Sequence, residues 1–193
     1  MSIHGYQLGT AKLAASPISI GDLRLLEQTV LFGEDDRRAL GEAAEALEPQ
    51  IEEILDVWYG FVGANAQLIA HFSNSRGEPQ PEYLAAVRRR FGQWIRDTCT
   101  RPYDQAWLDW QHEIALRHHS LKKNRTDQAD STPIIPLSLM VAFIYPITAT
   151  LRPFLEKSGK SAEDVDRMWH AWFKAVTLTV VLWIAPYARD GEF

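Results

Sequence analysis

Apolar side chains recur three and four residues apart along almost the whole chain of 193 residues. This spacing puts them on one face of an α-helix, whereas a half-buried strand alternates apolar and polar residues. The clearest example is the stripe formed by Tyr83, Val87, Phe91 and Trp94. No convincing alternating segment and no internal repeat occur in the sequence. The pattern therefore predicts an all-α fold in one domain that covers residues 1–193.

The expected ends of the helices follow from residues that begin and end helices. Residues 1–18 are predicted to form an irregular N-terminal arm, and Ser19 or Asp22 to cap the first helix, which Gly33 should end. Pro146 is expected to kink the penultimate helix. Loops are predicted at 74–81 and 122–136. The expected helices run from Ser19 or Asp22 to Gly33, over 34–47, from Pro49 past Val62, over 66–72, from Tyr83 to Arg101, from Trp107 to His118, over 137–156 and over 162–185.

Charge and composition exclude several classes of protein. The net charge of -5 argues against a nucleic-acid partner, since phosphate binding needs a basic surface. The single Cys99 excludes an intrachain disulfide, fits a reducing, cytoplasmic location, and suggests a buried apolar side chain. The start of the chain lacks the pattern of a signal peptide. The most apolar stretches, 139–151 and 175–188, are shorter than the ~18 to 20 residues that cross a bilayer, so we expect buried helices and no membrane association.

The pair His118-His119 is the main candidate for chemistry in this chain. A neutral imidazole is the commonest protein ligand for a transition metal or haem iron. His118 shares a helical face with Trp107 and Ile114, so its ring should point inward. His119 is rotated by about 100° and should face solvent or an edge.

Other metal sites fit the histidines less well. The zincin pattern of two histidines four residues apart around a glutamate is absent, although Glu113 follows His112. A dinuclear carboxylate bundle needs a Glu-x-x-His motif on two helices, and that pair is not found. A haem needs only one inward imidazole in an apolar slot. From the spacing alone, an ordinary core histidine remains the more common explanation for His118.

Several long strings, in order along the chain, resemble the protoglobins, and with them the resemblance covers nearly the whole sequence. In the arm, His4-Gly5-Tyr6 stands where the family has Pro-Gly-Tyr. The strings are Trp58-Tyr59-Gly60-Phe61-Val62-Gly63, residues 83–91, residues 103–109, Leu116-Arg117-His118-His119, Lys122-Lys123-Asn124, residues 141–150 and Ala171-Trp172-Phe173-Lys174.

The resemblance implies a single haem-binding globin domain with a specific set of site residues. Its fold would be a three-over-three helical sandwich with an extra N-terminal helix and arm, and its cofactor haem b. His118 would be the proximal ligand of a pentacoordinate iron. Tyr59 would donate a hydrogen bond to bound dioxygen. The residues expected to line the pocket on the other side are Trp58, Tyr59, Phe91, Phe143 and Ile147.

The function implied by the resemblance is reversible binding of dioxygen, carbon monoxide and nitric oxide. Two alternatives remain open: conversion of reactive nitrogen or oxygen species such as nitric oxide or peroxynitrite, and gas sensing through a separate partner. The family also implies a homodimer through the last two long helices. The haem propionates require cations or backbone donors. The candidate cations, among which the sequence does not decide, are Arg90, Arg117, Lys122 and Lys123.

The sequence departs from the family near the proposed ligand. Trp110 and His112 stand where relatives tend to have tyrosine, and Ala115 replaces a glycine before His118. The added methyl group is expected to change packing below the haem without removing the ligand.

Overall fold

The computed structural model describes residues 3–189, 191 and 193. These residues form helices, one isolated β-bridge between Ser73 and Pro79, and no strand. The all-α prediction is therefore confirmed. Short 3-10 turns cover Glu48–Gln50, Ala70–Phe72 and Ala185–Tyr187. The α-helices are α1 (Ile20–Thr29), α2 (Glu34–Leu47), α3 (Ile51–Ala64), α4 (Ala66–Ile69), α5 (Pro81–Thr100), α6 (Gln105–His118), α7 (Leu137–Ala142), α8 (Ile144–Glu156) and α9 (Ala162–Ile184).

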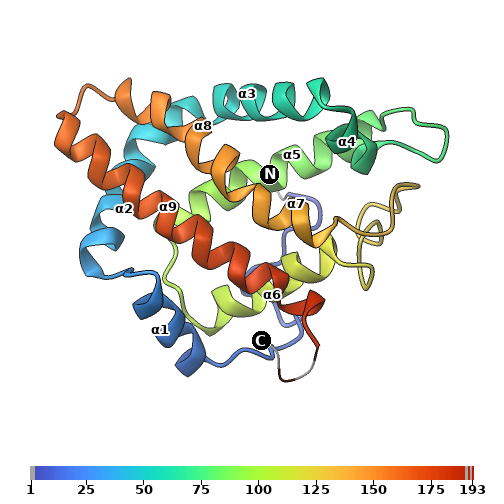
Figure 1. The fold of residues 1–193 in the computed structure, drawn as a ribbon, viewed down its shortest axis with the longest axis horizontal. Coiled ribbons are helices and arrows are strands. Elements are labelled where there is room, and N and C mark those ends of the chain that lie inside the picture. Colours follow the sequence, from blue (N-terminus) through green and yellow to red (C-terminus); the bar gives the residue numbers. More distant parts are fainter. Residues whose placement is uncertain (1–2, 190, 192) are drawn as a thin grey trace.

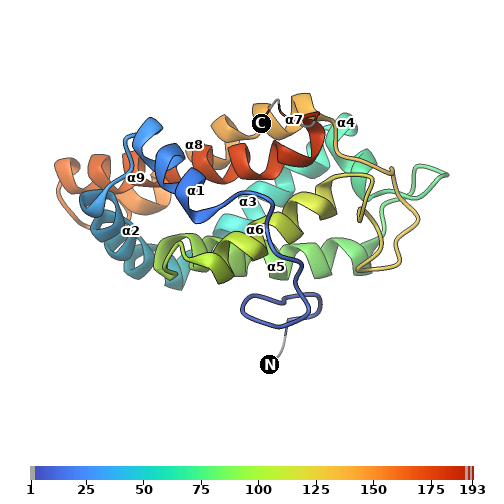
Figure 2. The ribbon, with the colours of Figure 1, turned by 90° about the horizontal axis from the view of Figure 1, so that it is seen from below.

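The long helices pack in two layers, as expected for a globin-like sandwich (Figure 1). Figure 2 shows α2, α5 and α6 in one layer and α8 and α9 in the other. Helix α9 packs against α2, α6 and α8, and α3 packs against both α5 and α8. Helix α1 precedes this set, and the arm passes over α5 and α6 (Figure 2). Residues 1 and 2 of the predicted arm lie outside the described residues.

Side-chain caps fix the starts of three helices. The Ser19 hydroxyl accepts a hydrogen bond from the Asp22 N–H, and the Asp22 carboxylate accepts one from the Ser19 N–H, which makes a capping box at α1. Asp104 caps α6 by accepting from the Trp107 N–H. Ser161 caps α9 by accepting from the Asp164 N–H. Each cap satisfies a backbone donor that has no partner inside the helix.

The prediction that Gly33 ends the first helix is wrong. Helix α1 ends at Thr29, and Leu31 adopts the left-handed conformation with a φ of 57°. The Phe32 N–H donates to the Glu27 carbonyl at 2.8 Å and the Leu31 N–H to the Gln28 carbonyl at 3.1 Å, the two bonds of a Schellman motif. Leucine here takes the position that glycine usually holds. Gly33 instead precedes α2 and donates its N–H to Asp36.

Pro146 interrupts the penultimate helix near the position where the sequence predicted a kink. The segment 137–156 divides at Phe143 into α7 and α8. A proline ring clashes with the carbonyl four residues earlier, here that of Ala142, where α7 ends. Pro146 is the third residue of α8, where its missing N–H needs no partner within the helix. Phe143, between α7 and α8, keeps a helical backbone, and its N–H donates to the Leu139 carbonyl at 3.0 Å.

Two helical stretches are longer than their most apolar parts indicate. Leu137–Glu156 and Ala162–Tyr187 are long and apolar enough to cross a membrane by length and composition alone. The sequence argument from their apolar length is therefore wrong. Central helices of soluble proteins meet the same criterion, and α9 lies against α2, α6 and α8. The two stretches differ in burial. Of the most apolar 18 residues, 28% are buried inside the protein in Leu137–Glu156 and 56% in Ala162–Tyr187.

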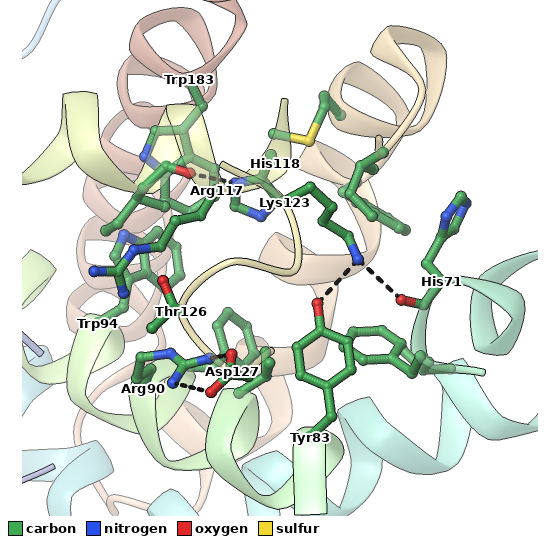
Figure 3. Close-up of a pocket in the computed structure, with 18 of the residues that line it drawn as sticks. His71, Tyr83, Arg90, Trp94, Arg117, His118, Lys123, Thr126, Asp127 and Trp183 are labelled. Carbon is green, nitrogen blue, oxygen red and sulfur yellow. Dashed lines mark hydrogen bonds and ion pairs between the residues drawn. The ribbon is translucent and has the colours of Figure 1, made fainter. Parts of the chain in front are cut away.

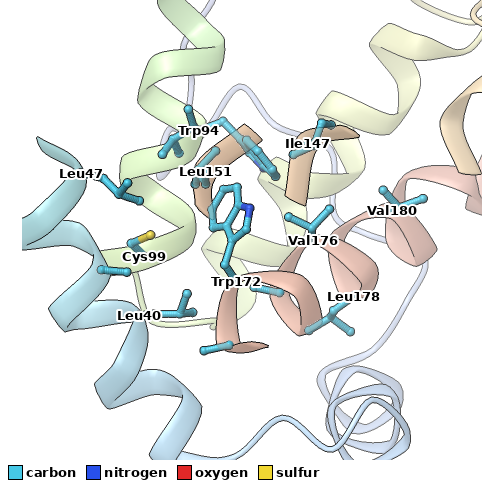
Figure 4. Packing of buried hydrophobic residues seen from close by; sticks show 14 of the residues in the cluster. Leu40, Leu47, Trp94, Cys99, Ile147, Leu151, Trp172, Val176, Leu178 and Val180 are labelled. Carbon is cyan, nitrogen blue, oxygen red and sulfur yellow. The ribbon is translucent and has the colours of Figure 1, made fainter. Parts of the chain in front are cut away.

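Trp172 lies at the centre of the hydrophobic core (Figure 4). It has no accessible surface, and its ring meets that of Trp94 edge to face at 5.4 Å. Cys99 is buried in the same cluster, as the sequence indicated. Burial raises the pKa of the Cys99 thiol to about 12, so this cysteine is an unreactive packing residue.

Candidate cofactor pocket

A cavity of about 200 Å³ lies between α3, α5, α6, α8 and α9. Most of its lining is aromatic or aliphatic, with charged side chains from α5, the end of α6 and the loop that follows. The structure brings all six predicted site residues to this one cavity; they are His118, Trp58, Tyr59, Phe91, Phe143 and Ile147. The functional roles that the resemblance implied for them remain predictions.

His118 is the last residue of α6, and its ring points into the cavity (Figure 3). Its Nδ1 lies 2.9 Å from the Ile114 carbonyl oxygen, one helical turn back. Because a carbonyl only accepts, Nδ1 carries the hydrogen and Nε2 keeps a free lone pair. Burial lowers the pKa of His118 to about 4, so the ring is neutral at pH 7. This is the state in which imidazole binds a metal ion.

Trp183 of α9 restrains the His118 ring. The two rings are stacked with centroids 5.0 Å apart, and the Trp183 N–H donates to the side-chain oxygen of the buried Gln111 at 2.9 Å. Rotation of the imidazole would break both the stacking and the bond to Ile114. The ring is therefore preorganised.

The remaining histidines do not form a metal cluster. No group of three His, Cys, Asp or Glu side chains in the described part of the chain could hold a metal ion. His119 is half-buried beside Tyr187, with the ring centroids 4.9 Å apart, and neither His119 nor His112 lines the cavity. The helical phase of the sequence thus separated the two adjacent histidines correctly.

Aromatic side chains cover the cavity wall formed by α3, α5 and the start of α8. The Trp58 ring lies 5.6 Å from that of Phe91 and 5.7 Å from that of Phe143. The Tyr59 hydroxyl has no hydrogen-bond partner among the described residues, and burial raises the Tyr59 pKa well above its ordinary value. The Tyr59 phenol therefore stays protonated and has a donor to offer to a ligand in the cavity.

The charged side chains gather at one edge of the cavity. Arg90 makes two hydrogen bonds to Asp127, at 3.0 and 2.5 Å. Arg117 and Lys122 both bind Glu113, at 2.9 and 2.5 Å. The arm closes over this edge, since Arg90 donates to the His4 carbonyl and Arg117 to the Gly5 carbonyl. Gly5 has a φ of +73° and leaves no room for a Cβ atom, which would meet Thr126 at 2.7 Å.

Lys123 differs from these cations because its hydrogen-bond partners are neutral. Its Nζ donates to the Tyr83 hydroxyl at 2.9 Å and to the His71 carbonyl at 3.2 Å (Figure 3). It also donates to the Asn124 side-chain oxygen at 2.9 Å. The contact between Lys123 and Tyr83 was not predicted, although Lys123 was one of the candidate cations. Tyr83 belongs to the apolar stripe of α5, and its contact with Lys123 joins segments 40 residues apart.

The loop that carries Lys123 is closed at its base by the end of α6. The Ile135 N–H donates to the His118 carbonyl at 2.9 Å. The Tyr187 hydroxyl lies 2.7 Å from the Ile135 carbonyl and 3.1 Å from the His118 carbonyl. Residues 119–134 therefore form a loop whose two ends lie together at the end of α6.

Two comparisons with known proteins bear on this pocket. Residues 21–193 match the family model described as Protoglobin, which covers nearly the whole chain and every pocket residue discussed above except those of the arm. No curated protein matches the chain at a significant level.

Proposed function

The chain belongs to the protoglobin family, which implies haem-based gas binding, and we propose that it binds dioxygen, carbon monoxide and nitric oxide at a pentacoordinate haem b iron ligated by His118. The observation that carries the proposal is the state of His118. Its ring is neutral, its Nδ1 is committed to Ile114, and its Nε2 is free in a cavity walled by aromatic rings. These are the features that a haem iron requires of its protein ligand.

The residues around His118 fit a haem. Flat aromatic and aliphatic side chains offer an apolar slot, and the cations at one edge match a cofactor that carries carboxylates on one side. When bound, the haem supplies the iron at which a gas molecule binds. The residues of the chain hold the imidazole, exclude water and offer the Tyr59 phenol as a donor.

Optical spectra of the protein reconstituted with haem test this function. We expect the ferrous form to show a five-coordinate, histidine-ligated Soret band that shifts when carbon monoxide is added. A protein that gives no Soret band above that of free haem would contradict the proposal. Turnover of nitric oxide or peroxynitrite remains a prediction, and a rate at substrate excess no faster than that of free haem would remove it.

Replacing Tyr59 with phenylalanine is expected to increase the dissociation rate of dioxygen by about tenfold. The change removes one donor whose hydrogen bond contributes about 1 to 1.5 kcal/mol, while the phenyl ring keeps its contacts with Phe72. Stopped-flow measurement of dioxygen displacement gives the rate. Carbon monoxide is the control ligand, because it carries little negative charge and its rate should change less than about threefold. Equal changes for both gases would show that Tyr59 acts only by size.

A homodimer through α7, α8 and α9 forms part of the same proposal. Val141 and Tyr145 are exposed, Tyr145 to 77%, and Phe173 of α9 is also exposed. Exposed aromatic residues are enriched in interfaces. We expect sedimentation of a dimer at micromolar concentration and of a monomer after Tyr145→Glu. Leu25→Glu on the exposed side of α1 should leave the dimer intact. A wild-type monomer would contradict this part of the proposal.

A further inference from the structure

Lys123 is the cation at the cavity edge that has no carboxylate partner. Arg90 is bound to Asp127, and Arg117 and Lys122 share Glu113. In the part of the chain that the structure describes, the hydrogen bonds of the Lys123 Nζ go only to the Tyr83 hydroxyl, the His71 carbonyl and the Asn124 amide oxygen. Its positive charge is therefore held in place but not neutralised.

The burial of Lys123 makes this arrangement costly for a protein without a ligand. Only 7% of Lys123 is exposed, and lysine is rarely buried without a negative partner. Burial lowers its pKa to about 8, with Asp127 opposing that effect from beyond hydrogen-bond distance. A negatively charged group bound in the cavity would offset the free-energy penalty of burying the Lys123 ammonium.

Tyr83 lies beside the Lys123 ammonium and offers a hydrogen-bond donor to the cavity. Its hydroxyl oxygen accepts the hydrogen bond from Lys123, so its own hydrogen is free to be donated. Both side chains line the cavity, and the Lys123 Nζ also lies 5.1 Å from the Tyr83 ring. A phenol donor with a buried ammonium behind it is a good partner for a carboxylate, because charge-assisted hydrogen bonds are the strong ones.

We propose that Lys123 and Tyr83 form the binding site for one haem propionate. The inference rests on the proposed function, and it assigns the carboxylate site to the one candidate cation whose described partners are all neutral. Arg90, Arg117 and Lys122 serve chiefly to fix Asp127, Glu113 and the arm.

Haem loss to an excess of a haem acceptor, followed at the Soret band, tests the inference. The proteins are the wild type, Lys123→Gln, Tyr83→Phe and Lys122→Gln. Lys122→Gln is the matched control, since it removes a neighbouring lysine at the same edge that is bound to the Glu113 carboxylate and, unlike Lys123, is partly exposed to solvent. Each protein is loaded with haem and, separately, with haem dimethyl ester, which has no carboxylate charge.

We expect Lys123→Gln to speed the loss of haem by at least about tenfold and Tyr83→Phe by a smaller factor. Neither change should alter the loss of the dimethyl ester, and Lys122→Gln should change the loss of haem by less than about threefold.

Two results would overturn the inference. Equal acceleration for haem and its ester would mean that Lys123 only supports the fold, and equal effects of Lys123→Gln and Lys122→Gln would mean that no specific site exists. Failure of the proposed function is distinct from both, since wild type would then bind neither haem nor its ester.

Discussion

Replacing His118 with alanine is expected to abolish the histidine-ligated haem spectrum completely. The change removes the imidazole that the Ile114 carbonyl and the Trp183 ring hold in position, and no other histidine lies on the same cavity wall in the described chain. His71, which also lines the cavity, is bound through Nδ1 to Thr132. The measurement is the set of ferrous, carbonmonoxy and ferric spectra of wild type and variant, recorded at equal haem content.

Two controls make the His118 result specific. His119→Ala should keep the wild-type spectrum, because that ring packs on Tyr187 outside the cavity. Free imidazole, added to His118→Ala, should restore the histidine-like spectrum, because the substitution leaves a space of imidazole size beside Trp183. A histidine-ligated spectrum that survives in His118→Ala, or that is lost in His119→Ala, would show that the ligand has been misassigned.

Replacing Trp172 with alanine is expected to lower the free energy of unfolding by about 3 to 5 kcal/mol. The side chain is fully buried on α9, the helix that packs against α2, α6 and α8. Its removal leaves a cavity beside Trp94 that the neighbouring rings fill only in part. Urea unfolding of the haem-free protein, followed by circular dichroism, gives the difference without a contribution from bound haem.

Trp172→Phe should be much less harmful than Trp172→Ala. A phenyl ring keeps most of the buried contact area and removes an indole N–H that has no hydrogen-bond partner among the described residues. Leu25→Ala, at an exposed position of α1, is the control and should change stability by less than about 0.5 kcal/mol. An effect of Trp172→Ala no larger than that of Leu25→Ala would contradict the central place of Trp172.

Most of the helix boundaries could be predicted because local chemistry determines them. Ser19 and Ser161 cap the helices that they precede, and Pro146 interrupts a helix through its own ring. The end of α1 could not be predicted in this way. There Leu31 adopts the left-handed conformation, which a leucine side chain disfavours. Burial of Phe32 and the hydrogen bonds to the last helix carbonyls offset that strain.

The site was predictable to a similar extent. Helical phase distinguishes His118 from His119, and the i,i+4 spacing of Glu113 and Arg117 allows that ion pair to be read from the sequence. The pairing of Arg90 with Asp127 joins a helix and a loop 37 residues apart, so it depends on tertiary structure. The partners of the four cations could therefore be assigned only from the fold.

Because loop 119–134 is closed at His118, the position of the His118 ring and the charges at the cavity edge can change independently of each other. The end of α6 is held by Ile135 and Tyr187, so the position of the imidazole does not depend on the length or composition of the loop. The entropy of closing such a loop rises slowly, by about 0.6 kcal/mol for each doubling of its length. Insertions and substitutions between residues 119 and 134 can thus remodel the charged edge of the cavity, while the surroundings of the His118 ring stay constant.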